Sequence, residues 1–169
     1  MDCAGAAAAE AVVVVILSGA SIQARHIIRP HLPRTEILLP DGRRISYGES
    51  FAGYDIRIRE TVTLPMGMTV LASTLEEFRM PNDVLGVVHD KSSWARRGIS
   101  VQNTVLEPGW RGWLTLEMLL SPLANAARCM TIEAGWPIAQ VIFHRIDEET
   151  AGYGDGKYQD QPPRPVDAL

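Results

Sequence analysis

Hydroxyl and basic side chains are concentrated in residues 89–98, with the sequence HDKSSWARRG. Ser92 and Ser93 stand beside Lys91, and Arg96 follows Ser92 by about one turn if the segment is helical. Such a turn gathers charged and neutral hydrogen-bond donors, and its free backbone N–H groups add to the attraction for an anion. The segment predicts an anion-binding turn, although a solvated basic turn explains its composition equally well.

A carboxylate follows in residues 105–117, with the sequence VLEPGWRGWLTLE. Its Pro-Gly pair is typical of a tight turn, and the strand predicted after that turn ends at Glu117. Alternation places Trp113, Thr115 and Glu117 on one face and apolar residues on the other. Glu117 is then either exposed or partly buried with a raised pKa. The strand pattern alone favours the exposed position.

A third segment lies near the end of the chain, where Tyr153 precedes the sequence KYQDQ at residues 157–161. Its tyrosines, lysine and amides could close over a phosphate chain. Loops of this composition are common, so the segment by itself is a weak indication.

The elements that must position these groups are mainly short strands. Turn residues recur every eight to fifteen residues or so. The runs between them predict strands at residues 54–59, 69–74, 85–89, 113–119, 128–132 and 138–145. Alternation in residues 54–59 predicts a strand with one wet face. Two short helices are expected, one at residues 19–28 with Ser18 as its N-cap and one at residues 92–97. The pattern favours a sandwich or distorted barrel.

Length and charge place these strands in one domain. A chain of 169 residues can bury a core without disulfides or structural metals. We expect an Ala-rich extension at residues 1–14, a β domain at residues 15–150 and a flexible tail at residues 151–169. The formal net charge of −4 argues against a protein that coats nucleic acid. The apolar run at residues 11–17 is too short to span a bilayer.

The cysteines favour a reducing, cytoplasmic setting. Cys3 and Cys129 form no Cys-x-x-Cys pair, so a disulfide framework and a zinc knuckle are both disfavoured. We interpret Cys129 as a small buried hydrophobe.

Taken together, these segments resemble the dCTP deaminase family within the dUTPase-like superfamily. The matching motifs are YDIR at residues 54–57, KSSWAR at 91–96, EPGW at 107–110, LTLE at 114–117, IAQ at 138–140 and KYQDQ at 157–161. They occur in the family's order and cover roughly residues 15–161. The resemblance implies a mainly β, distorted β-barrel or jelly-roll-like subunit in a homotrimer, with active sites where subunits meet.

The resemblance also implies roles for individual residues. Glu117 would be the catalytic carboxylate, assisted by Ser92 and Arg96. Glu107 would hold the deoxyribose hydroxyl, and phosphates would lie near the residue 91–96 segment, Gln140 and the tail. The residues expected to bind the substrate are Lys91, Ser93, Asn103, Thr104, Glu107, Thr115, Gln140, Tyr153, Lys157 and Gln161.

The implied reaction is hydrolytic deamination of dCTP to dUTP. Many nucleobase deaminases use zinc held by His-x-Glu and Pro-Cys-x-x-Cys motifs, which this sequence lacks. We therefore expect no zinc; Mg²⁺ would be carried by the triphosphate. A lone carboxylate would act first as base and then as acid. The expected ligands are dCTP, dUTP and the inhibitor dTTP.

Several alternatives stay open at this point. One is a dUTPase that makes dUMP and diphosphate, another is a bifunctional enzyme that converts dCTP to dUMP, and a third acts on a 5-substituted cytosine. A non-catalytic trimer that senses nucleotides is the alternative from another class. Dedicated dUTPases rely on an Asp at the position of Glu107 and do not need Glu117. Glutamates at both positions therefore favour deamination.

Overall fold

Antiparallel strands form three sheets around one core in a computed structural model, which describes residues 15–102, 104–122 and 128–168. The six-stranded sheet has the order β2 (Thr35–Leu38), β3 (Arg44–Glu49), β4 (Tyr54–Arg57), β12 (Pro137–Arg145), β7 (Val84–Asp90) and β9 (Val105–Leu106). The four-stranded sheet has the order β1 (Ile28–Arg29), β6 (Thr69–Arg79), β10 (Arg111–Leu120) and β8 (Ile99–Val101). A separate ribbon pairs β5 (Val62–Pro65) with β11 (Cys129–Ile132).

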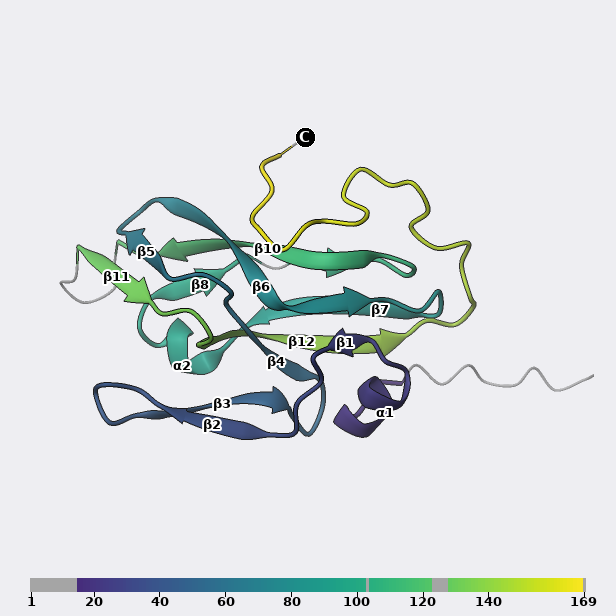
Figure 1. Cartoon of the computed structure of the whole chain (residues 1–169), viewed down its shortest axis with the longest axis horizontal. Helices are drawn as coiled ribbons and strands as arrows, with labels where there is room; N and C mark the ends of the chain where they lie inside the picture. Colours follow the sequence, from purple (N-terminus) through teal and green to yellow (C-terminus); the bar gives the residue numbers. More distant parts are fainter. Residues whose placement is uncertain (1–14, 103, 123–127, 169) are drawn as a thin grey trace, which may run out of the picture.

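The two larger sheets pack on each other and curl around the core (Figure 1). Phe78 and Leu116 come from the four-stranded sheet, whereas Tyr54 and Phe143 come from the six-stranded one, and all four are fully buried. Full burial of such side chains contributes about 1.5–3 kcal/mol each. The prediction of a mainly β fold is confirmed.

The helices are shorter than predicted. Helix α1 spans Gly19–Ala24, and Ser18 caps it by accepting a hydrogen bond from the backbone of Ser21, as expected. It ends early because His26 adopts a positive φ of 54° and the chain then enters β1. Helix α2 spans only Ser92–Ala95. None of the helices in the described parts of the chain is long and apolar enough to cross a membrane.

Two expectations about individual side chains are wrong. The alternation in β4 does not produce a wet face, because Asp55 is only 4% exposed and is paired with Lys91. Cys129 is exposed instead of buried, since it begins the short ribbon strand β11 at the rim of the fold.

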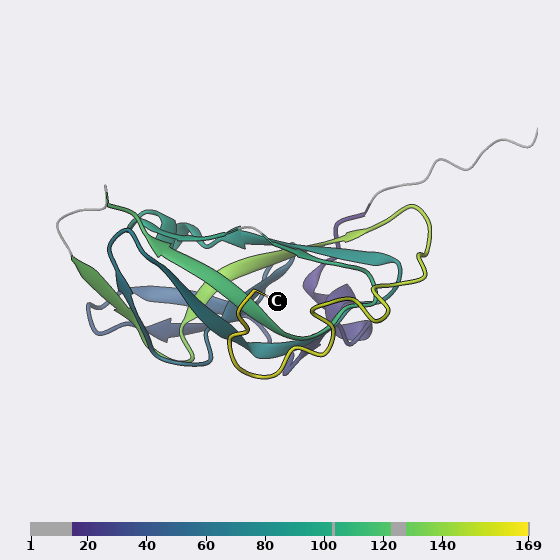
Figure 2. The same ribbon diagram turned by 90° about the horizontal axis from the view of Figure 1, so that it is seen from above.

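The C-terminal segment runs back across β10 (Figures 1 and 2). Gln161 forms a parallel bridge with Gly112, and its carbonyl accepts a hydrogen bond of 3.1 Å from the N–H of Trp113. Arg111 and Asp160 form an ion pair beside this bridge. A Cβ atom on Gly112 would lie 2.7 Å from the Gln161 nitrogen, so only glycine allows this close approach. The last described residues are thus laid along a central strand.

Candidate active site

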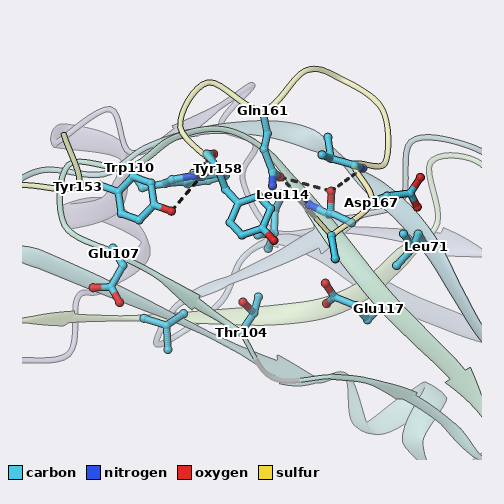
Figure 3. A pocket seen from close by; sticks show the side chains of 14 residues that line it. Leu71, Thr104, Glu107, Trp110, Leu114, Glu117, Tyr153, Tyr158, Gln161 and Asp167 are labelled. Carbon is cyan, nitrogen blue, oxygen red and sulfur yellow. Dashed lines mark hydrogen bonds between the residues drawn. The ribbon is translucent and has the colours of Figure 1, made fainter. Parts of the chain in front are cut away.

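The cavity that holds Glu117 lies between β10, β9 and the returning C-terminal segment, with a volume of about 360 Å³ (Figure 3). We call it the acidic pocket, because three carboxylates line it and its described lining contains no Lys, Arg or His. The lining residues are Leu71, Thr104, Val105, Glu107, Trp110, Leu114, Thr115, Glu117, Tyr153, Tyr158, Gln161, Val166, Asp167 and Ala168. Six of the predicted site residues are therefore brought together here.

Glu117 sits on β10 opposite Leu71 of β6, and its side chain points into the pocket (Figure 3). The neighbouring residues Leu116 and Met118 are fully buried on the other face, as the alternation predicted. Burial raises the pKa of Glu117 above its usual value, and a backbone hydrogen bond offsets part of this rise. Glu117 is therefore partly buried, and the exposed side chain that the strand pattern favoured is wrong.

Glu107 enters the same pocket from the turn between β9 and β10. The N–H of Trp110 donates to the Glu107 carbonyl at 3.0 Å, which closes the predicted Pro-Gly turn. Gly109 has a φ of 77°, in the left-handed region that favours glycine. The turn fixes the backbone of Glu107 while its side chain stays exposed and available to a ligand.

The returning segment supplies one wall of the pocket. The Thr115 hydroxyl contacts the Gln161 amide oxygen at 3.3 Å and accepts a hydrogen bond of 3.1 Å from the Val166 N–H. Trp110 donates its indole N–H to the Tyr158 carbonyl at 2.7 Å. Tyr153 also lines the pocket, whereas Lys157 points elsewhere and lies over the ring of Tyr158. Gln161 and Tyr153, but not Lys157, thus line the pocket that holds the carboxylates.

A second cavity, of about 260 Å³, is built on other strands and shares no lining residue with the first. We call it the polar hollow, and it is lined by Arg34, Ser46, Ser50, Asp55, Asp90, Lys91, Ser92 and Gln140. Three residues predicted to serve the reaction, Lys91, Ser92 and Gln140, are found here.

The Lys91 ammonium is less available to an anionic ligand than the basic segment 89–98 suggests. Its ammonium lies 2.5 Å from the Asp55 carboxylate, and both side chains are nearly buried. The Ser46 hydroxyl donates to the same carboxylate at 3.1 Å. The Gln140 amide donates to the Ser50 hydroxyl at 2.9 Å, so its orientation is also fixed. The hollow therefore presents organised hydroxyl and amide groups around a charge pair that is already neutralised.

Other predicted residues lie outside both cavities. Arg96 is exposed at the C-terminal end of α2, and Ser93 is half-buried within that helix. Asn103 lies outside the described residues. Sequence reasoning missed Arg34 of the polar hollow and Leu71 of the acidic pocket, because neither stands in a motif that carries chemistry. Asp55 and Leu114 stand in the motifs YDIR and LTLE, but neither was expected to line a site.

Metal ligands do not gather in the described parts of the chain, where no group of three or more His, Cys, Asp or Glu side chains is placed to hold an ion. Glu107, Glu117 and Asp167 line one cavity without forming such a group.

Solved structures with the same fold include nucleotide enzymes. A 2′-deoxycytidine 5′-triphosphate deaminase from Agrobacterium tumefaciens matches with a TM-score of 0.58 at 15% identity, covering 78% of this chain and 48% of that one. A mutant dUTPase from phage phi11 of S. aureus, which coordinates a structural Mg(II) ion, matches with a TM-score of 0.52 at 18% identity, covering 70% and 94%. The sheets described above thus have the dUTPase-like fold.

Sequence comparison narrows this class. Residues 21–146 match the family model described as dCTP deaminase-like. A dCTP deaminase of Acidovorax sp. (strain JS42) is 40% identical over 168 residues, covering 80% of this chain and 87% of that protein. A dCTP deaminase of Ralstonia pickettii (strain 12J) is 38% identical with the same coverage. The chain belongs to the dCTP deaminase-like family.

Proposed function

We propose that this chain is a dCTP deaminase, which converts dCTP and water to dUTP and ammonia. The observation that carries the proposal is the placement of Glu117, a partly buried carboxylate with a raised pKa, in a cavity with Glu107, Thr104 and Thr115. Membership of the dCTP deaminase-like family supports the same substrate. We assign the reaction to the cytoplasm, in line with the cysteine content.

Glu117 acts as base and then as acid. It takes a proton from the attacking water as the water oxygen bonds to C4 of cytosine, and it passes this proton to ring nitrogen N3. A second proton then moves from the new hydroxyl to the amino group through the same carboxylate. The C4–N4 bond breaks, ammonia leaves and the C4 carbonyl forms. A carboxylate with a raised pKa suits both steps, because it is a stronger base towards the attacking water and, once protonated, it can still pass the proton on.

The other pocket residues hold the nucleoside. Glu107 accepts a hydrogen bond from the 3′-hydroxyl of deoxyribose, and Thr115 and Thr104 face the base beside Glu117. We assign the same role, contact with the base, to Asn103. Tyr153, Lys157 and Gln161 close over the phosphates from the tail, which requires Lys157 to leave the ring of Tyr158.

The phosphates need positive charge, which the described lining of the acidic pocket does not supply. Its described lining carries three carboxylates and no basic side chain, so a triphosphate would be repelled there. The polar hollow offers hydroxyl and amide donors, and its two carboxylates are engaged, Asp55 by Lys91 and Asp90 by the Val101 N–H. We therefore propose a homotrimer in which the acidic pocket of one subunit faces the polar hollow of the next. Ser92, Arg96, Lys91, Ser93 and Gln140 then come from the partner subunit.

Magnesium fits this arrangement as part of the substrate. Three phosphate groups supply oxygen ligands that Mg²⁺ prefers, and the described protein groups need only accept the complex. When bound, the ion neutralises phosphate charge. The proton transfers stay with Glu117, and dTTP would compete for the same cavities.

Product analysis tests the proposal. Purified protein is given dCTP or dUTP separately in magnesium buffer, and the products are identified by chromatography and mass spectrometry. We expect dCTP to yield dUTP, or dUMP if hydrolysis follows. Consumption of dUTP alone would make the protein a dUTPase and overturn the role of Glu117. No reaction with either nucleotide, despite tight binding, would support a nucleotide sensor instead.

A further inference from the structure

The polar hollow contains four charged side chains, of which three are already engaged. Lys91 and Asp55 neutralise each other at 2.5 Å. The Asp90 carboxylate accepts a hydrogen bond of 2.7 Å from the Val101 N–H. Arg34 is the remaining one, and within the described residues its guanidinium has no carboxylate partner.

The backbone that leads to Arg34 is fixed, whereas its guanidinium is free to move. The Leu32 carbonyl accepts a hydrogen bond of 3.0 Å from the Glu49 N–H, and the Leu32 N–H donates to the Tyr54 hydroxyl at 2.9 Å. The adjacent Pro33 carbonyl packs on Gly48, where a Cβ atom would approach to 2.5 Å. The segment that precedes Arg34 is therefore fixed against β3 and β4, and only the exposed side chain can move.

The Arg34 guanidinium rests on the ring of Phe51, which directly follows Ser50 of the hollow in the sequence. Its central carbon lies 5.5 Å from the ring centroid of Phe51, which is 92% exposed. A cation–π contact at such an exposed site is weak. A phosphate with two negative charges offers Arg34 a stronger, bidentate partner. Phe51 thus keeps the guanidinium near the hollow without holding it against a competing anion.

The neutral donors beside Arg34 complete an oxyanion site. Ser50, Ser92 and Gln140 line the same cavity, and Gln140 is oriented by its hydrogen bond to Ser50. Hydroxyl and amide groups can share the oxygens of one phosphate with a guanidinium, because each phosphate oxygen accepts more than one hydrogen bond.

We propose that Arg34 binds the terminal phosphate of the nucleotide and so determines the preference for a triphosphate over a monophosphate. The inference rests on the proposed function, since it assigns a ligand to the polar hollow. Arg34 moves from Phe51 onto the phosphate, whose charge the Lys91–Asp55 pair does not balance. The residue lies outside the motifs that identify the family.

Calorimetry with three ligands tests this assignment. The full-length protein is titrated with dCTP, dCMP and inorganic triphosphate, each with magnesium, as wild type and as Arg34→Ala, Arg34→Lys and Arg44→Ala. Arg44 is the matched control, because it is an exposed arginine on β3 that lines neither cavity. Arg34→Ala should weaken dCTP and triphosphate binding by about tenfold to a hundredfold. It should leave dCMP binding within about twofold, since a monophosphate does not extend to Arg34. Arg34→Lys should recover part of the loss because it restores charge but not bidentate geometry.

The outcomes separate this proposal from the proposed function. Unchanged dCTP and triphosphate affinity in Arg34→Ala would overturn the assignment, and so would an equal loss for all three ligands. Triphosphate binding that depends on Arg34 without any cytosine nucleotide binding would support the phosphate site and overturn the deaminase. A wild type that binds none of the ligands would overturn both.

Discussion

The acidic pocket and the polar hollow handle charge in opposite ways. The pocket collects Glu107, Glu117 and Asp167 without a basic side chain in its described lining. The hollow instead pairs a buried Lys91 with Asp55, and Arg34 has no carboxylate partner among the residues that the structure describes. Proton transfer needs a carboxylate with a raised pKa, and phosphate binding needs donors and positive charge. Positive charge placed beside Glu117 in the same cavity would lower the pKa of its carboxyl group. The separation keeps the two requirements apart within one chain, and the proposed trimer would bring them together.

The largest expected effect comes from removing the base in the acidic pocket. Glu117→Gln should lower kcat for deamination at least about a thousandfold, because the amide cannot accept the water's proton. Binding of dCTP should change little, as measured by calorimetry. Glu148→Gln is the matched control on an exposed loop, and it should keep wild-type kcat. Deamination retained by Glu117→Gln would remove this residue from its role.

Mixing two inactive variants tests whether the cavities face each other across subunits. Glu117→Gln damages only the pocket and Ser92→Ala damages only the hollow. Random mixed trimers should contain intact sites at about a quarter of their interfaces, so activity should return towards about a quarter of wild type. The measurement is dUTP formation after the two variants are co-expressed or are unfolded and refolded together. If the mixture stays as inactive as its components, both cavities serve the same subunit or the pairing is wrong.

A smaller effect is expected from the tail, which closes one wall of the pocket. Deleting residues 153–169 should weaken dCTP binding by about tenfold, because Tyr153, Lys157 and Gln161 are lost. The fold should survive, since the core lies in the sheets. The control deletes residues 162–169 alone and retains these three side chains. Equal affinity for the longer deletion and the wild type would show that the tail does not bind the phosphates.

The smallest effect concerns stability. The pKa of Glu117 is raised in the folded state, so its favourable contribution is present below its unfolded pKa and is lost as the pH rises through the folded pKa. At pH 7, Glu117→Gln should therefore unfold about 1–2 °C higher than the wild type, a small shift because solvent screens the partly exposed group. The difference should vanish near pH 4. Calorimetric melting at the two pH values measures it, and a lower Tm at pH 7 would contradict it.

Local pattern in the sequence predicts one cavity better than the other. Alternation along β10 locates Glu117 and the buried face behind it, and the Pro-Gly turn locates Glu107. The short strands β1, β2, β3, β5, β8 and β9 were not predicted, because they are brief or polar and are defined by their partners. Arg34 gives no local signal either, because it lies just before the short strand β2 and stands in none of the motifs.

Burial of charged groups is the other feature that the sequence conceals. Asp55 alternates with apolar neighbours as a wet residue would, yet it is buried because Lys91, which lies 36 residues further along, neutralises it. Glu76 is likewise fully buried and paired with Arg57 of β4 at 2.8 Å, and burial raises its pKa. Pairings of this kind depend on strand register, which periodicity does not specify.

The turn that carries Glu107 imposes a rule on anyone who redesigns this protein. Gly109 lies so close to the start of the tail that an added Cβ atom would meet the Gly152 Cα at 2.8 Å, and the Tyr153 N–H donates to the Pro108 carbonyl at 2.7 Å. A library that varies residues 107–110 to alter sugar preference would therefore also displace the tail. Residues 108–109 and 152–153 form one unit of design, to be diversified together or left alone.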